Sequence, residues 1–219
     1  MSHEVRILKK HCLNHDVIEF HLEKPSGYVF NAGQAIELTI AEPSQQGPAP
    51  FTFTGLNSDI TLQLIIKIYR EHNGITAALE KKEVGDTVVI SDPWDSFINK
   101  GPGIFLAGGA GITPFIALLR QLAVDKNIGA SQLFFANKTD EDVFLQKELK
   151  SLLGNHYIDI ITRDNNGTGH DILNEDLIKQ YVRNFTLPFY VCGPPGFMDA
   201  VQAILTKAGA SNEMVNVSF

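Results

Sequence analysis

A cluster of glycines follows a short apolar run near the middle of the chain. Residues Ile104–Ala107 are typical of a buried strand, and Thr113 followed by Pro114 favours a helix start, with Thr as N-cap and Pro as first helical residue. The turn between them contains Gly108, Gly109, Gly111 and Ile112. Bare backbone N–H groups, a helix dipole and missing Cβ atoms form a cradle for a phosphate. The spacing is neither G-x-G-x-x-G nor a Walker loop. The segment therefore predicts an anion site, with a turn that binds no ligand as the alternative.

A second apolar run of the same kind lies near the carboxyl end. Phe189–Val191 is typical of a buried strand, and a glycine-proline turn separates it from a helical pattern. That turn contains Cys192, Gly193, Pro194 and Pro195. In an open parallel sheet, ligands bind beyond the carboxyl ends of the strands. The two turns therefore predict one binding site at one edge of such a sheet.

The first part of the chain is rich in short alternating apolar runs that turn residues separate. Strands of this length and spacing favour an antiparallel barrel. One short helix is predicted over residues 76–82, with Thr76 as its N-cap. The predicted strands are residues 5–8, 17–22, 35–40, 62–68 and 87–90.

Beyond a linker at residues 99–103 the pattern changes to strands that alternate with helices, which predicts a parallel sheet. The predicted strands are residues 104–107, 132–136, 157–162, 188–192 and an edge strand at 215–219, and the predicted helices are 113–124, 141–153, 173–183 and 196–208. The fold class is therefore two-domain: an N-terminal antiparallel β-barrel over residues 1–100, then an α/β parallel-sheet domain over residues 101–219.

The composition excludes several classes of function. The net charge of −7 argues against nucleic-acid binding, which needs a basic surface. The two cysteines, Cys12 and Cys192, supply neither a disulfide framework nor a four-cysteine zinc or iron–sulfur site, and no metal site is predicted. No run of apolar residues reaches the length of a membrane span, so no membrane partner is expected. A cytoplasmic protein is the default expectation.

The motifs GGAGITP and CGPPGFM resemble the nucleotide-binding half of the ferredoxin–NADP reductase family. The resemblance extends upstream and covers nearly the whole chain. Phe30–Gln34 is similar to the family's F-x-P-G-Q, Pro50–Thr52 to its R-x-Y-S/T flavin motif, and Asn73–Thr76 with Leu79 to its G-x-x-S-x-x-L. The resemblance implies a β-barrel that binds flavin, FAD by the family's habit, and an α/β domain that binds NAD(P)H.

The resemblance also implies roles for residues of the flavin half. Thr52 would donate a hydrogen bond near flavin N5, and Phe51 would pack against the ring. The terminal aromatic Phe219 resembles the residue that stacks on the flavin and yields to nicotinamide. The other predicted flavin-binding residues are Pro50 and the pyrophosphate-binding helix start, Asn73, Gly74, Ile75 and Thr76.

In the nucleotide half, the resemblance places Cys192 beside the nicotinamide C4 and flavin N5, where proximity and alignment speed hydride transfer. Thr162 and Arg163 resemble the Ser-Arg pair that binds the 2′-phosphate of NADP, which favours NADPH over NADH. His170 stands where a second Arg is often found. Asn137 and Lys138 are candidates to line the adenosine pocket.

The function predicted from this resemblance is a flavin-dependent NAD(P)H reductase that passes electrons, one at a time, to a separate carrier such as flavodoxin or ferredoxin. A reductase component of an oxygenase is one alternative. Another is a nucleotide-binding or regulatory module that has lost flavin, because Ala49 replaces the motif's Arg and Asp92–Asp95 replaces its G-P-x-G. Lys67 or Arg70 are candidates for the missing charge. The sequence leaves the oligomeric state open.

Overall fold

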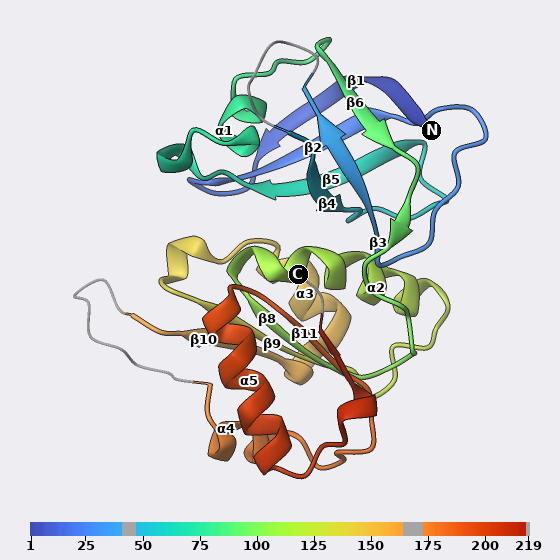
Figure 1. Cartoon of the computed structure of the whole chain (residues 1–219). Helices are drawn as coiled ribbons and strands as arrows, with labels where there is room; N and C mark the ends of the chain where they lie inside the picture. The colour runs from blue at the N-terminus through green and yellow to red at the C-terminus, as the bar shows by residue number, and fades with distance from the viewer. Residues whose placement is uncertain (41–46, 164–172, 218–219) are drawn as a thin grey trace.

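A computed structural model describes residues 1–40, 47–163 and 173–217. Two sheets stand one above the other, an antiparallel one built from the first part of the chain and a parallel one built from the second (Figure 1). The fold class predicted from the sequence is confirmed. The exact boundary at residue 100 stays a prediction. Among the described residues no helix is long and apolar enough to cross a membrane.

Antiparallel pairing links the strands of the first sheet in the order β4-β3-β6-β1-β2-β5, with β7 paired to β3. The backbone N–H of Thr54 donates to the carbonyl of Gln63 at 3.0 Å, which joins the chain after β4 to β5 and brings the two ends of the sheet together. The strands are β1 (Ser2–Cys12), β2 (Val17–Glu23), β3 (Gln34–Thr39), β4 (Ala49–Thr52), β5 (Thr61–Lys67), β6 (Thr87–Ser91) and β7 (Trp94–Asp95).

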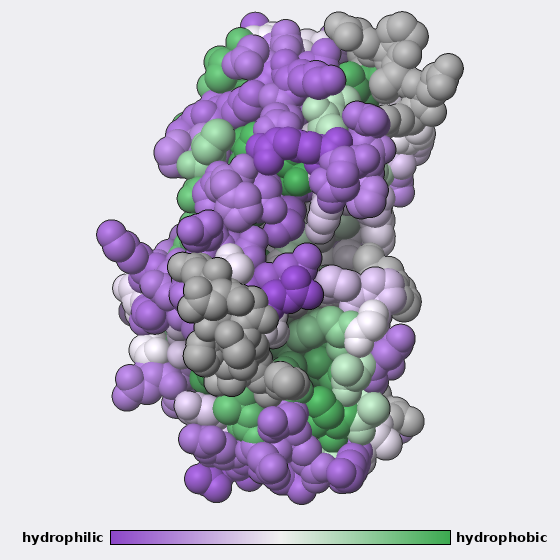
Figure 2. All heavy atoms as spheres, turned by 90° about the vertical axis from the view of Figure 1, so that its left-hand side faces the viewer, coloured by the Kyte–Doolittle hydropathy of each residue, from purple (hydrophilic) through white to green (hydrophobic). Residues whose placement is uncertain are grey.

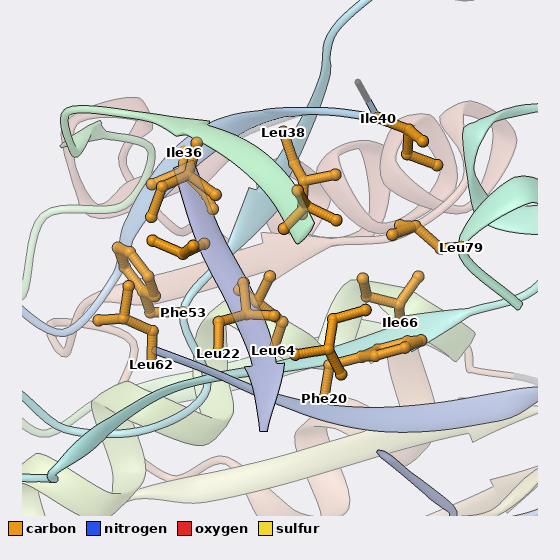
Figure 3. Close-up of a cluster of buried hydrophobic side chains, with 14 of the residues drawn as sticks. Phe20, Leu22, Ile36, Leu38, Ile40, Phe53, Leu62, Leu64, Ile66 and Leu79 are labelled. Carbon is orange, nitrogen blue, oxygen red and sulfur yellow. The ribbon is translucent and has the colours of Figure 1, made fainter. Parts of the chain in front are cut away.

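The barrel core is built by the alternation that the sequence shows. Residues two apart on one strand share a face, so Leu62, Leu64 and Ile66 of β5 point inward together (Figure 3). Leu79, from the short helix α1 (Ile75–Glu80), closes the same cluster. Full burial of each such side chain stabilises the fold by about 1.5–3 kcal/mol.

The second sheet is parallel throughout, in the order β10-β9-β8-β11-β12. Its strands are β8 (Ile104–Gly108), β9 (Gln132–Asn137), β10 (Tyr157–Ile161), β11 (Phe189–Cys192) and β12 (Val215–Val217). Its helices are α2 (Thr113–Val124), α3 (Gln146–Leu153), α4 (Glu175–Tyr181) and α5 (Pro195–Lys207), and short 3₁₀ turns are η1 (Arg70–His72), η2 (Gly109–Ile112), η3 (Asp140–Asp142), η4 (Gly154–His156) and η5 (Asn212–Met214).

Helices cover both faces of this sheet. Helices α2 and α3 pack on the face that looks toward the barrel, and α4 and α5 pack on the opposite face. The first of these clusters also includes Val17, Ile65 and Phe97 of the barrel part. Apolar packing is therefore continuous across the junction of the two domains.

The bounds predicted for the helix over 113–124 are confirmed, but the predicted N-caps Thr76 and Thr113 are wrong. Gly74 precedes α1, and Thr76 lies inside it, where its hydroxyl accepts a hydrogen bond from the backbone N–H of Tyr69. Thr113 is the first residue of α2 and not its N-cap, because the 3₁₀ turn η2 leads directly into the helix and the Thr113 hydroxyl donates to the Ala110 carbonyl. The helix predicted over 141–153 begins later, after Leu145 in a left-handed conformation.

Candidate functional site

A cavity of about 710 Å³ lies between the barrel and the parallel sheet. Its size suits a small-molecule cofactor or substrate. On the face drawn in Figure 2, apolar surface gathers just below the junction of the two halves, among hydrophilic atoms. The cavity lies at the carboxyl ends of β8 and β11, the place that the two glycine turns predict.

The barrel wall of the cavity comes from the ends of two strands. Phe51 and Thr52 line it from the end of β4, and Ile65, Ile66 and Lys67 line it from the end of β5. Apolar side chains thus flank a hydroxyl on the wall where a flat ring would lie. This mixture fits an aromatic cofactor that needs packing on its faces and a hydrogen bond at its edge.

The opposite wall is made by the two glycine turns, which touch each other. A Cβ placed on Gly111 would lie 2.3 Å from the Cys192 carbonyl oxygen, so only glycine lets the two turns approach this closely. Gly109 is different: its φ of +52° is left-handed, and an added Cβ would meet nothing within 4 Å. Because Gly109 lines the cavity, that empty space is room for a ligand against bare backbone.

Cys192 lines the cavity at the end of β11, and Ala107 of β8 is its neighbour in the sheet register. Burial raises the pKa of the Cys192 thiol to about 11, against a smaller opposite effect from the Gly193 backbone. The thiol is therefore protonated at neutral pH. A protonated, largely buried thiol suits close packing beside a reacting carbon and does not suit nucleophilic attack, which needs the thiolate.

Asn137 lies at the end of β9 and lines the cavity with only 5% of its surface exposed. Its Nδ2 donor has no hydrogen-bond partner among the described residues. Its backbone carbonyl accepts from both the N–H and the hydroxyl of Thr162, and the Arg163 N–H donates to the Lys138 carbonyl. A buried donor without a partner is costly unless a ligand supplies the acceptor, so this corner fits an oxygen-rich molecule such as a nucleotide.

An ionic cluster lies where the barrel meets η3. The Lys67 ammonium is 2.9 Å from a carboxylate oxygen of Asp16 and 3.7 Å from one of Asp142. Burial would lower the pKa of Lys67, but the two carboxylates outweigh it and the pKa is raised. His15 also approaches both carboxylates, at 3.6 Å each. His15, Asp16 and Asp142 carry the kinds of atom that bind metal ions. The Lys67 ammonium already neutralises part of the carboxylate charge, so we assign no metal to this cluster.

The structure brings most of the predicted site residues to this one cavity, although their roles stay predictions. Those that line it are Pro50, Phe51, Thr52, Thr76, Gly108, Gly109, Gly111, Thr113, Pro114, Thr162, Cys192, Gly193, Pro194 and Pro195. Those outside its lining are Asn73, Gly74, Ile75, the fully buried Ile112 and the exposed Arg163. Phe219 and His170 lie outside the described residues.

Sequence reasoning missed part of the lining. The missed residues include Tyr69, Ser96, Phe97, Asp142 and Phe197. Phe197 directly follows the second glycine turn, and its ring would meet a Cβ on Gly193 at 2.7 Å, so proximity to that motif is the signal that could have found it. Arg70, a candidate for the missing flavin charge, is instead paired with Glu80 at 2.6 Å.

Comparison with known protein families accounts for both halves of the chain. Residues 2–96 match an FAD-binding domain, and residues 105–203 match an oxidoreductase NAD-binding domain. The two matches fall on the barrel and on the parallel-sheet part. The cavity therefore lies between an FAD-binding and an NAD-binding domain.

Several characterised proteins are similar over most of the chain. NADH-cytochrome b5 reductase 2 of Rattus norvegicus is 29% identical over 70% of each chain. NADH–cytochrome b5 reductase 1 of Arabidopsis thaliana is 28% identical over 96% of this chain and 82% of that protein. The reductase component of propane 2-monooxygenase from Rhodococcus jostii (strain RHA1) is 25% identical over 96% of this chain, which spans 61% of that protein.

Solved structures share the fold. The CS-b5R domains of human Ncb5or superpose with a TM-score of 0.85 at 21% identity, over 100% of this chain and 70% of that one. A ferredoxin NADP⁺ reductase from Neisseria gonorrhoeae, with bound FAD and NADP, superposes with a TM-score of 0.82 at 19% identity, over 100% and 99% of the two chains. At these identities the likeness establishes the architecture.

Proposed function

Since the chain belongs to the ferredoxin reductase-like family of flavin-dependent NAD(P)H oxidoreductases, we propose that it passes electrons from NAD(P)H, through FAD, to a separate one-electron carrier protein. The observation that carries this proposal is the single cavity that Thr52 lines from the FAD-binding domain and Cys192 from the NAD-binding domain. When bound there, FAD supplies a ring that takes a hydride at N5 and releases electrons singly.

The residues of this chain would bind and orient the two reactants. Thr52 would hold the ring edge through its hydroxyl, with Phe51 packed on the ring. Cys192, as a protonated thiol, would fill the space beside the nicotinamide C4, and the open backbone at Gly109 would let the nucleotide approach. Such a site acts by proximity and alignment, and no general acid or base is required for the hydride to cross.

We infer that the protein accepts both NADH and NADPH. The relatives whose names state a nucleotide are NADH enzymes, which supports NADH. Thr162 and Lys138 line the cavity, and the backbone N–H of Arg163 donates to the Lys138 carbonyl, so two cationic residues adjoin Thr162. The resemblance assigns the 2′-phosphate to Thr162 and Arg163, which supports NADPH. Replacing Arg163 with Ala should weaken NADPH and leave NADH unaffected. An unchanged preference would show that the 2′-phosphate is recognised elsewhere.

The carrier is proposed to be a small one-electron protein. The sequence resemblance favours a flavodoxin or ferredoxin. The b5 reductases among the relatives support a cytochrome as well, and the propane monooxygenase component supports the alternative of an oxygenase partner. A carrier of the ferredoxin type would be separate from this chain, because two cysteines cannot hold an iron–sulfur cluster of the four-cysteine type. A cytoplasmic location stays part of the proposal.

An absorbance spectrum of the purified protein is the first test. Flavin bands that bleach with NADH or NADPH under anaerobic conditions are expected, followed by recovery when a carrier is added. Ferredoxin, flavodoxin and cytochrome b5 should be compared at equal concentration, and the carrier that restores the bands fastest identifies the class. A colourless protein that takes up no FAD would support the module that has lost flavin.

A further inference from the structure

Arg120 of α2 forms hydrogen bonds to both domains at their junction. Its Nη1 donates to the backbone carbonyl of Thr54 at 2.7 Å and to the side-chain oxygen of Gln63. Its Nε and Nη2 donate to the two carboxylate oxygens of Glu148 on α3, at 2.6 and 2.9 Å. Only 19% of the Arg120 side chain is exposed. One side chain therefore joins α2 and α3 of the NAD-binding domain to the FAD-binding domain.

The two barrel residues that Arg120 contacts lie close in sequence to residues of the cavity wall. Thr54 lies two residues after Thr52, and Gln63 lies two residues before Ile65, and both neighbours line the barrel wall. Thr54 is fully buried, and its hydroxyl also donates to Gln63 at 3.1 Å, so β4 and β5 are tied to each other at this point. Arg120 thus binds the barrel at a point where two of its segments are hydrogen-bonded to each other.

Helix α2 carries the other wall. Its first residues, Thr113 and Pro114, line the cavity and follow the glycine turn directly. The helix lies between the barrel and the parallel sheet, so its axis passes along the junction (Figure 1). We propose that Arg120 is a positioning residue for hydride transfer, which fixes the distance between the nicotinamide wall on α2 and the flavin wall on β4 and β5.

The loss of hydride rate in an Arg120 variant can be estimated from the position of Arg120 on α2. Arg120 is seven residues from the start of α2, which is about 10 Å along the helix axis. If the helix pivots by about 5° when the guanidinium bonds are lost, its start moves by about 1 Å, and a misplacement of this size can slow a reaction about 100-fold. Planar donation to three groups at once also explains why arginine is needed, since a lysine ammonium cannot span them.

The inference rests on the proposed function only for the hydride step, not for the carrier. The experiment compares Arg120→Ala, Arg120→Lys and Gln63→Leu with a control away from the junction. Arg6→Ala removes an arginine–glutamate pair of 3.1 Å that lies wholly within the barrel. Anaerobic stopped-flow bleaching of the flavin gives the hydride rate at saturating nucleotide and the nucleotide dissociation constant from its concentration dependence.

The expected result is a hydride rate at least tenfold lower in Arg120→Ala and Gln63→Leu, with partial recovery in Arg120→Lys. The nucleotide dissociation constant should stay within about threefold, and the Arg6→Ala control should keep a rate within about twofold of the wild type. An unchanged rate in Arg120→Ala overturns the proposal. An equal loss in Arg6→Ala also overturns it, because it would reflect general destabilisation.

A second measurement does not depend on bound flavin. In the cofactor-free protein, hydrogen exchange should rise in Arg120→Ala at residues 52–65 and at the start of α2, while β9 and β10 keep their protection. Unchanged exchange at the junction would show that Arg120 does not hold the two domains together. A wild-type protein that takes up no flavin would contradict the proposed function, and the exchange result would still decide whether Arg120 joins the domains.

Discussion

In the glycine turn after β8, we expect alanine substitutions at Gly109 and Gly111 to lower stability by different amounts. An added methyl group at Gly109 meets nothing within 4 Å, and its cost is the left-handed φ of +52°, roughly 1–2 kcal/mol. For a chain of this length a loss of that size lowers the midpoint of thermal unfolding by about 2–8 °C. Gly109→Ala should therefore fold, with a modest loss of stability.

Gly111→Ala should lose much more stability. Its methyl group would lie 2.3 Å from the Cys192 carbonyl oxygen and 2.6 Å from the Gly193 nitrogen, and both are backbone atoms that cannot rotate away. The turns after β8 and β11 must separate by about 1 Å to admit it. Overpacking of this kind typically costs about 1–3 kcal/mol, and here it adds to the displacement of two strand ends that form the cavity wall.

Gly109→Ala should also weaken nucleotide binding, because Gly109 lines the cavity next to empty space. If the Gly109 backbone approaches a phosphate, the methyl group removes a charge-assisted hydrogen bond worth about 1.5–3 kcal/mol, so affinity should fall at least tenfold. Titration calorimetry with NADP⁺ and NAD⁺, and thermal unfolding followed by circular dichroism, measure both effects. Wild-type affinity in Gly109→Ala would refute the phosphate approach, and wild-type stability in Gly111→Ala would refute the close contact of the turns.

Three further predictions follow from the site. Cys192→Ala should slow flavin bleaching far more than it weakens nucleotide binding, and equal stopped-flow rates would exclude its proposed place beside the reacting carbon. Because the folded thiol keeps its proton up to about pH 11, whereas the ordinary pKa is 9.0, the native state loses stability as pH rises from 9 to 11; thermal unfolding should show this fall, and Cys192→Ala should reduce it. Asn137→Leu should weaken nucleotide binding without lowering the unfolding midpoint, because its Nδ2 has no protein partner to lose among the described residues, and unaltered titration calorimetry would count against a ligand there.

The predictions from sequence agree with the structure where a short run of residues determines a strand or a turn. The apolar runs that end in glycine at 108 and at 193 predict two strand ends at one edge of a parallel sheet, and the parallel pairing of Ala107 with Cys192 confirms it. The N-caps of α1 and α2 were mispredicted because they were inferred from residue type alone, whereas the hydroxyls of Thr76 and Thr113 form other hydrogen bonds.

Contacts between domains could not be predicted in this way. Arg120 has no motif, and its partners Thr54 and Gln63 are more than fifty residues away in the chain. Its role depends on the angle at which α2 meets the barrel, which apolar packing across the junction sets. Local sequence thus predicted most residues that line the cavity, whereas the contacts of Arg120 across the junction depend on tertiary packing.

The ionic cluster at the cavity edge leads to a prediction about cofactor affinity. Ala49 stands where the family has an Arg, and Lys67 is the one cation among the described residues of the barrel that line the cavity. Asp16 and Asp142 both pair with it, so two carboxylates outweigh one ammonium. This ionic cluster, which combines Asp16 and Lys67 of the barrel with Asp142 of η3, therefore places a net negative charge at the cavity edge, near an anionic cofactor.

Asp142→Asn should strengthen binding of FAD or nucleotide. The amide oxygen can still accept the hydrogen bonds from the N–H and hydroxyl of Thr139 that cap η3, so the fold should be kept. One charge at about 10 Å and an effective dielectric constant of about 40 contributes about 0.8 kcal/mol, or about a fourfold change in dissociation constant, and salt should reduce it. Asp140→Asn makes the same charge change at an exposed position outside the cavity and serves as the control. Weaker binding in Asp142→Asn would mean that the carboxylate holds Lys67 in a productive position, and that the charge of this lysine, not the backbone alone, compensates for the missing arginine.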